Sequence, residues 1–296
     1  CGSDLHALMH ADRMSRASRA AGQETLVMDP ERDVIMGHEF CAEVVDHGPG
    51  TQKTHRAGTR VCSIPMLLRP SGVEGIGYSN EVPGGFAELM VLNEMLLLEV
   101  PNGLATEHAA LTEPMAVGVH AVEKAQLTPG DVALVLGCGP VGLSVIAALK
   151  LKGVARIVAA DFSPKRRALA ETLGADVVVD PAVTSPYLSW EQAAAPDPSA
   201  SGGSGGGLEF LGPALRPAVI FECVGVPGVI QQILAGAPRG ARIVVAGVCM
   251  EPDEIQPLYA VTKELNLHFV IAYTPEEFSR TLGHIAEGRI PVGPLV

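Results

Sequence analysis

The sequence lacks the features that mark several common classes of protein. Its 21 Lys and Arg against 33 Asp and Glu give a net charge of −12, which leaves no basic surface for a nucleic-acid backbone. Its six cysteines show no paired spacing, which disfavours a disulfide framework and favours a reducing environment. The first residues are not the basic start and apolar run of a signal peptide. We therefore expect a cytoplasmic protein with a small-molecule partner and no nucleic-acid or membrane partner.

Long hydrophobic runs are also scarce. Residues 132–149 form an uncharged stretch with the length of a marginal membrane span. Gly137, Gly139 and Pro140 interrupt it, and its first half is typical of a buried strand, so a membrane span is disfavoured. The composition, with 47% hydrophobic and 18% charged residues, is that of an ordinary globular protein. A chain of 296 residues is long enough for two domains with their own cores.

The pattern of apolar residues changes along the chain. Before about residue 100, short apolar runs between Gly and Pro predict antiparallel strands, at 41–45, 59–64 and 86–92. From residue 131, β-branched strands alternate with helices, which predicts a parallel sheet covered on both faces. These strands are expected at 132–136, 156–160, 176–179, 218–224 and 242–246, and the helices at 141–152, 164–173 and 229–235. A Gly- and Ser-rich insert near 196–217 predicts a mobile surface loop.

A nucleotide-binding fingerprint lies where the first of these parallel strands meets its helix. The run Gly137-Cys-Gly139-Pro140-Val141-Gly142 matches G-x-G-x-x-G, and Asp161 follows at the end of the next strand. Gly137 would permit the tight turn, Gly139 the approach of the pyrophosphate, and Gly142 the close packing of helix on strand. The helix N-terminus offers free N–H groups to the phosphates.

The residue at the end of the second strand favours NAD over NADP. Asp161 would accept hydrogen bonds from the adenosine ribose, and its carboxylate would repel a 2′-phosphate. The neighbouring basic residues, among them Arg166, would tolerate such a phosphate or simply be solvated. Arg166, Val224 and Val248 complete the candidate cofactor-binding residues.

Three further motifs are unremarkable singly but specific in combination. They are Cys1-Gly-Ser3-Asp4-Leu-His6, Gly37-His38-Glu39 and Glu113-Pro114. In this order, followed by the fingerprint, they resemble the zinc-dependent medium-chain dehydrogenase/reductase family of alcohol and polyol dehydrogenases. The resemblance covers essentially the whole chain.

The resemblance implies an α/β fold in which a GroES-like partial β-barrel is joined to a Rossmann doubly wound parallel sheet. Residues 1–112 would form the catalytic domain and 113–271 the NAD-binding domain. Residues 272–296 would return to the catalytic domain. Family members have barrel strands before the equivalent of Cys1 and a strand and helix after the Pro291 region, so we expect both ends to be truncated.

The resemblance also implies one catalytic zinc ion. Cys1 and His38 would be ligands, with either Glu113 or Glu39 as the third, and Asp4 would orient the imidazole of His38. Thiolate, imidazole and carboxylate suit zinc and leave one position for the substrate oxygen. Glu113 alone would also suit a helix start without any metal role. Many family members bind a second, structural zinc through four closely spaced cysteines. Cys62 is the single cysteine between residues 61 and 88, so no structural zinc is expected, as in the sorbitol-type enzymes.

Ser3 and His6 match the proton relay of the family. The resemblance implies that zinc lowers the pKa of a bound alcohol, Ser3 passes its proton through the cofactor ribose to His6, and hydride leaves for the nicotinamide. We thus expect a homodimer or homotetramer that interconverts an alcohol or polyol and its carbonyl compound with NAD. The alternatives are a zinc-free quinone or enoyl reductase of the same superfamily and a non-catalytic NAD-binding module. The substrate itself is not evident from the sequence.

Overall fold

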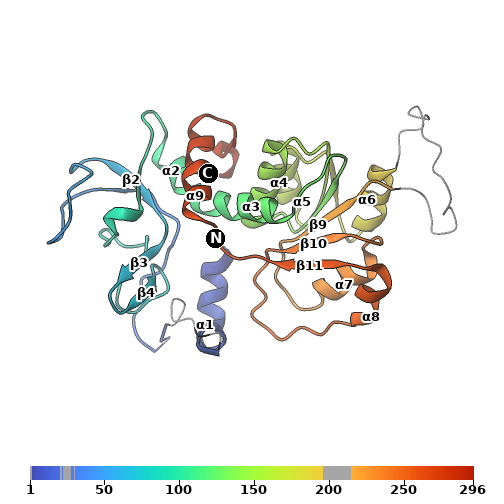
Figure 1. The fold of residues 1–296 in the computed structure, drawn as a ribbon, viewed down its shortest axis with the longest axis horizontal. Coiled ribbons are helices and arrows are strands. Elements are labelled where there is room, and N and C mark those ends of the chain that lie inside the picture. Colours follow the sequence, from blue (N-terminus) through green and yellow to red (C-terminus); the bar gives the residue numbers. More distant parts are fainter. Residues whose placement is uncertain (1, 21, 23–27, 30, 196–214) are drawn as a thin grey trace. The chain divides into compact units, whose positions relative to one another are not determined.

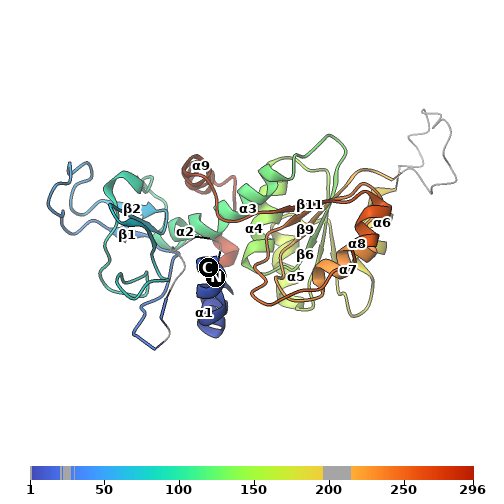
Figure 2. The same cartoon turned by 60° about the horizontal axis from the view of Figure 1, so that its bottom comes forward.

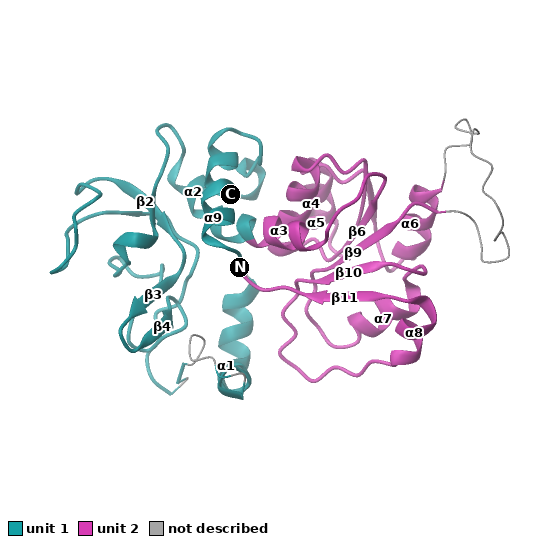
Figure 3. Cartoon of the chain, in the orientation of Figure 1, with its two compact units in different colours: residues 1–116, 273–296 teal, residues 117–272 magenta. Residues whose placement is uncertain are grey.

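The computed structural model describes residues 2–20, 22, 28–29, 31–195 and 215–296. The chain divides into two compact units, Cys1–Ala116 with Tyr273–Val296, and Val117–Ala272, which Figure 3 colours separately. Cys1 and most of the Gly- and Ser-rich insert lie outside the described residues, so the expectations for them are not addressed by the structure.

The second unit is built on a six-stranded sheet in the order β11-β10-β9-β6-β7-β8, and each neighbouring pair of strands is parallel. The strand order reverses between β6 and β9, where open α/β sheets bind ligands at the carboxyl ends of their strands. The bounds are β6 Val132–Leu136, β7 Arg156–Ala160, β8 Val177–Val179, β9 Ala218–Glu222, β10 Arg242–Val245 and β11 Asn266–Phe269.

Helices cover both faces of this sheet because its central strands are apolar on both sides. Every residue of β6 and β9 is buried, and burying each of their Val, Leu, Ile and Phe side chains contributes about 1.5–3 kcal/mol. In Figures 1 and 2, α4 and α5 lie on one face and α6, α7 and α8 on the other. Their bounds are α4 Pro140–Leu151, α5 Pro164–Thr172, α6 Pro186–Ala194, α7 Val229–Gly236 and α8 Pro257–Lys263.

The first unit has short antiparallel strands and helices. One sheet has the order β1-β2-β5 and a second pairs β3 with β4, and α3 (Thr112–Lys124) begins in this unit and ends in the other. The remaining bounds are β1 Ala42–Glu43, β2 Arg60–Ser63, β3 Met66–Arg69, β4 Gly72–Gly75, β5 Leu97–Glu99, α1 Gly2–Ala20, α2 Thr106–Ala110, α9 Pro275–Ala286, and the 3-10 turns η1 Glu94–Leu96 and η3 Gly293–Leu295.

The expected Rossmann sheet is confirmed, with strand and helix bounds within about two residues of those predicted. The strand predicted at 86–92 is wrong, because these residues form turns and irregular backbone. No described strand pairs with this segment, and a strand needs a partner for its N–H and C=O groups. The apolar side chains that suggested it, Phe86, Leu89 and Val91, are 75%, 69% and 63% exposed.

Candidate active site

Three glycines allow the loop that carries His38 to pack closely against its neighbours. Gly37 has φ +97°, and a Cβ built on Gly77 or Gly84 would lie 2.6 or 2.4 Å from the carbonyl oxygen of Gly37. Only residues without a side chain permit this approach. The packing holds the backbone at His38 in place and leaves the imidazole 7% exposed.

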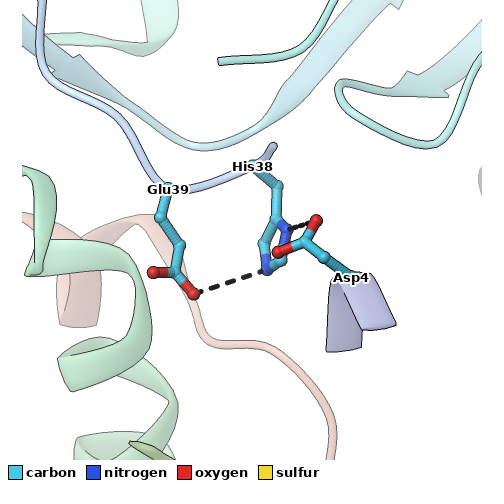
Figure 4. A group of neighbouring side chains, drawn as sticks. All are labelled: Asp4, His38 and Glu39. Atoms are coloured by element: carbon cyan, nitrogen blue, oxygen red, sulfur yellow. Dashed lines mark hydrogen bonds and ion pairs between the residues drawn. The ribbon is translucent and has the colours of Figure 1, made fainter. Parts of the chain in front are cut away.

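Both nitrogens of His38 face polar groups of the first unit. Nδ1 lies 3.1 Å from Oδ1 of Asp4 and 3.1 Å from the hydroxyl of Tyr78. Nε2 lies 3.3 Å from Oγ of Ser3 and 3.9 Å from a carboxylate oxygen of Glu39 (Figure 4). An imidazole whose Nδ1–H donates to Asp4 presents the lone pair of Nε2 toward Ser3 and Glu39.

Glu113 supplies a second carboxylate beside Nε2 of His38, with Oε2 at 3.9 Å. It lies in the first turn of α3 and is 9% exposed, and the hydroxyl of Tyr273 donates to its Oε1 at 3.1 Å. Tyr273 directly precedes the capping box by which Thr274 and Glu277 begin α9. Burial raises the pKa of Glu113 to about 7, an effect that Glu39 reinforces and His38 opposes.

The electrostatics of this cluster favour a cation. Burial alone would lower the pKa of His38, but its hydrogen bond to Asp4 and the charges of Glu113, Asp4 and Glu39 raise it instead. Burial likewise opposes the shift of Asp4, whose pKa is lowered by the hydrogen bond and charge of His38. The carboxylates therefore stabilise positive charge at the imidazole, and a metal ion would supply such charge permanently.

The donor set fits zinc. Ligand atoms of Asp4, His38 and Glu39 all lie within 4.8 Å of one another, and Glu113 reaches the same imidazole nitrogen. Imidazole nitrogen and carboxylate oxygen are both zinc ligands. Because Asp4 engages Nδ1, it lies where a residue that orients a metal-bound histidine is needed.

The structure places Ser3 at this cluster but does not pair it with His6. Ser3 approaches Nε2 of His38 at 3.3 Å. The ring of His6, one turn further along α1, contacts His10 edge to face with ring centroids 6.4 Å apart. The two members of the expected relay thus lie on one helix, and their side chains are not hydrogen-bonded to each other.

The second unit holds the glycine-rich turn between β6 and α4. Gly137 has φ +88°, and a Cβ on Gly142 would lie 1.8 Å from the carbonyl oxygen of Gly137, so both positions require glycine on conformational or steric grounds. Gly139 differs, because a Cβ there would meet no protein atom within 4 Å. Pro140 and Val141 begin α4.

Asp161, which directly follows β7, stabilises this turn through hydrogen bonds. It is 8% exposed, and its Oδ2 and Oδ1 accept the N–H groups of Cys138 and Ser163 at 2.8 and 2.7 Å. Arg166 lies 3.7 Å from Oδ2 with a half-exposed side chain, at 56%. Val224 and Val248 follow β9 and β10 and are 39% and 48% exposed.

Sequence reasoning missed three polar residues in these sites. Tyr78 contacts His38, with ring centroids 5.1 Å apart, and Tyr273 contacts Glu113. Glu222 ends β9 at 1% exposure, and its Oε1 accepts the N–H groups of Val224 and Gly225 at 2.7 and 2.8 Å. A charged residue at the end of an otherwise apolar strand, before a glycine, was the available signal for Glu222. No local sequence pattern indicated Tyr78 or Tyr273.

Two family models match the chain. The alcohol dehydrogenase GroES-like domain matches residues 1–102 and the zinc-binding dehydrogenase matches residues 140–287. The chain therefore belongs to the zinc-dependent medium-chain dehydrogenase/reductase family of alcohol and polyol dehydrogenases, as its motifs indicated. It is an oxidoreductase of the alcohol and polyol dehydrogenase class, which uses a nicotinamide cofactor and zinc.

Individual relatives agree. The (R,R)-butanediol dehydrogenase of Bacillus subtilis is 32% identical over 100% of this chain and 81% of its own length. The sorbitol dehydrogenase of Bos taurus is 28% identical over 100% and 78%. The crystal structure of the Bacillus subtilis 2R,3R-butanediol dehydrogenase superposes with a TM-score of 0.71, covering 88% of this chain and 72% of that one at 32% identity.

A Sinorhizobium meliloti protein solved with NADP gives a TM-score of 0.74 at 27% identity, covering 98% of this chain and 79% of its own. Among the described residues, no helix has both the length and the apolar character needed to cross a membrane.

Proposed function

We propose that this protein is a zinc-dependent, NAD-linked dehydrogenase that oxidises a secondary alcohol or polyol to the ketone and reduces it in reverse. The observation that carries the proposal is the arrangement around His38. Its Nε2 lies 3.9 Å from each of two carboxylates, Glu39 and Glu113, while Asp4 engages its Nδ1.

The residues that would hold the catalytic zinc are Cys1, His38 and one of the two carboxylates. When bound, zinc supplies a Lewis acid for the substrate oxygen and NAD supplies a hydride acceptor. Asp4 fixes the tautomer and orientation of His38. The equal distances of Glu39 and Glu113 from Nε2 make both candidates for the third ligand, so the ligand set has to be decided by substitution.

The proton released from the alcohol is proposed to pass to Ser3. Its Oγ lies at the polar cluster, 3.3 Å from Nε2 of His38, and a hydroxyl can accept one proton while donating another. His6, on the same helix, would carry the proton onward. Ser3 and His6 are therefore the proposed catalytic residues.

NAD is proposed as the cofactor in preference to NADP. Asp161 directly follows β7, the second strand of the fingerprint, so its carboxylate would accept hydrogen bonds from the adenosine ribose and repel a 2′-phosphate. Gly137, Gly139, Pro140, Val141 and Gly142 would receive the pyrophosphate. Arg166 lies 3.7 Å from the carboxylate of Asp161, and its positive charge would reduce the repulsion of a 2′-phosphate.

The substrate class is proposed from the relatives, whose names include butanediol, sorbitol and L-idonate dehydrogenases. All of these names point to compounds that carry several hydroxyl groups. The hydroxyls of Ser3 and Tyr78 beside His38 would suit a second hydroxyl of such a substrate, since each can donate and accept a hydrogen bond.

The domain assignment and the assembly are also proposals. Residues 1–112 and 272–296 would form the catalytic domain and 113–271 the NAD-binding domain, in a homodimer or homotetramer located in the cytoplasm. Support for self-association comes from β11, an edge strand of the sheet. Phe269 and Ile271 at its end are 66% and 69% exposed, and exposed edges pair readily with another chain.

The test is to count zinc per chain by mass spectrometry and to follow NADH formation from a panel of vicinal diols and polyols. Close to one zinc per chain, with activity that a chelator removes and zinc restores, supports the proposal. Glu39→Gln and Glu113→Gln, compared in parallel, identify the third ligand by which one loses zinc. Cofactor binding without zinc would favour the zinc-free reductase, and binding without turnover of any alcohol would favour a non-catalytic module.

A further inference from the structure

Two cysteines outside the expected zinc ligand set lie opposite each other on neighbouring strands. Strands β1 and β2 are antiparallel with Ala42 opposite Val61, and this register places Cys41 opposite Cys62. Cys62 in turn lies opposite Leu98 of β5. The pairing of three strands therefore determines which kind of cross-strand pair the two cysteines make.

Cys41 and Cys62 form the closer kind of pair. The N–H of Val100 bonds to the carbonyl of Arg60, so two residues further along Cys62 and Leu98 are also a hydrogen-bonded pair. The backbone polar groups of Cys62 thus point toward β5 and away from β1. In antiparallel pairs without backbone hydrogen bonds the Cα atoms lie about 4.5 Å apart, within the range of about 4.4–6.8 Å that a disulfide spans.

The side chains are already in contact. Both side chains belong to one apolar cluster of the first unit, in which Cys62 is buried and Cys41 packs against the buried residues, and the Sγ of Cys62 donates to the carbonyl of Ala109 at 3.2 Å. Cys62 is fully buried, whereas Cys41 is partly exposed. A small oxidant can therefore reach Cys41 first, with the second thiol held at the position where it would resolve the product.

We propose that Cys41 and Cys62 are a site of reversible thiol oxidation, at which a hydroperoxide converts the thiol pair into a cross-strand disulfide. Cys41 attacks one peroxide oxygen, the O–O bond breaks, and Cys41 becomes a sulfenic acid as water or an alcohol leaves. The sulfur of Cys62 then displaces the hydroxyl from Cys41 as a second molecule of water. Overall the two thiols lose two protons and two electrons, and the hydroperoxide is reduced.

The position of the pair gives the disulfide a consequence for the metal cluster. Cys41 follows Glu39 by two residues. Oxidation also removes the proton that Cys62 donates to Ala109, on the helix α2 that precedes α3 and Glu113. The disulfide would thus change the backbone next to Glu39 and next to the helix that precedes Glu113. A small thiol would reduce the bond by exchange through a mixed disulfide, which makes the oxidation reversible.

The test treats the purified, zinc-loaded protein with hydrogen peroxide, quenches it in acid with a thiol alkylating reagent, and maps the tryptic peptides. Trypsin separates the two cysteines because Lys53, Arg56 and Arg60 lie between them. We expect a linked peptide pair that has lost two hydrogen atoms and that disappears on reduction with a phosphine.

Two variants serve as controls. Cys41→Ser should abolish the linked pair and leave Cys62 unmodified, whereas Cys249→Ser, a partly exposed cysteine of the other unit, should form it as the wild type does. Recovery of Cys41 as a sulfinic acid beside an unmodified Cys62 would overturn the proposal. So would an intact thiol pair at a peroxide concentration that oxidises Cys249. Because the readout is the linked peptide, neither result depends on the proposed enzymatic activity.

Discussion

The carboxylate of Asp4 and the imidazole of His38 join two segments of the chain, with Oδ1 and Nδ1 3.1 Å apart. Asp4 lies in the first turn of α1, and His38 lies 34 residues later in the loop that packs against Gly77 and Gly84. A histidine held in this way has one nitrogen occupied and the other presented, which is the state that a zinc ligand requires.

Asp4→Ala should therefore weaken zinc binding by about 10- to 100-fold. The reason is that the imidazole loses the acceptor that fixes its tautomer, although Tyr78 still approaches Nδ1. Zinc affinity is measured by competition with a chelating dye. Asp12→Ala, an exposed residue on the same helix, is the matched control, and equal affinities for both variants would remove Asp4 from the metal site.

Glu222→Gln should weaken NAD binding by about tenfold, equivalent to about 1.4 kcal/mol. The buried carboxylate accepts the N–H groups of Val224 and Gly225, and the main-chain carbonyl of the same residue accepts the N–H of Gly247, so Glu222 holds the loops after β9 and β10. The carbonyl oxygen of a glutamine can still accept the N–H groups of Val224 and Gly225, but without the negative charge it holds them less strongly. Isothermal titration with NAD is the measurement, with exposed Glu191→Gln on α6 as control. Unchanged affinity would show that the loops are held by other contacts.

Two glycine variants should separate folding from cofactor binding. Gly142→Ala is expected to lower the melting temperature and abolish NAD binding, because its Cβ would overlap the carbonyl of Gly137. Gly139→Ala should melt like the wild type but bind NAD more weakly, since only a ligand could meet its Cβ. Thermal melts with and without NAD test both. A Gly139→Ala protein with full NAD affinity would refute the placement of the pyrophosphate.

Asp161→Asn should narrow the preference for NAD over NADP. The asparagine keeps one oxygen for the N–H of Cys138 and loses the bond from Ser163, while it removes the charge that repels a 2′-phosphate. A change in the turn affects both cofactors, whereas the charge affects only NADP. The ratio of kcat/KM with the two cofactors is the quantity to compare. If the variant discriminates as strongly as the wild type, the selectivity arises elsewhere.

The metal-free protein should lose stability as pH rises through neutrality. Burial raises the pKa of Glu113 from 4.5 to about 7, so between those values the folded state holds a proton that the unfolded chain has released. The contribution of Glu113 to the free energy of unfolding is complete below about pH 4.5 and is lost as the pH rises to 7 and beyond. The loss is on the order of 3 kcal/mol.

Glu113→Gln removes this titration while keeping an oxygen to accept the hydroxyl of Tyr273. Its free energy of unfolding in urea, with a chelator present, should therefore fall less between pH 5 and pH 8 than that of the wild type. The raised pKa of His38 also makes the free energy of unfolding fall as pH rises, and this part of the decline is common to both proteins. Parallel pH profiles of the two proteins would show that Glu113 is already ionised when no metal is bound.

The nucleotide-binding unit was predictable because its determinants are local. Strand and helix alternation, a glycine that needs positive φ at Gly137 and a residue without a Cβ at Gly142 are all visible within a short stretch of sequence. The same is true of the family assignment, which rests on short motifs in a particular order. The failed prediction at 86–92 had a local pattern too, but a strand also needs a neighbour, and none of the described strands supplies one.

What surrounds His38 was decided by the tertiary structure. The motifs named Asp4, His38, Glu39 and Glu113 as candidates, yet the two carboxylates lie at the same distance from Nε2 only because α3 and a glycine-rich loop meet there. Tyr78, Tyr273 and the Cys41–Cys62 pair come from segments far from their partners in the sequence or from strand register. Short-range patterns determine which element a residue joins, whereas the contacts between elements arise only when distant segments pack together, and these contacts decide the chemistry.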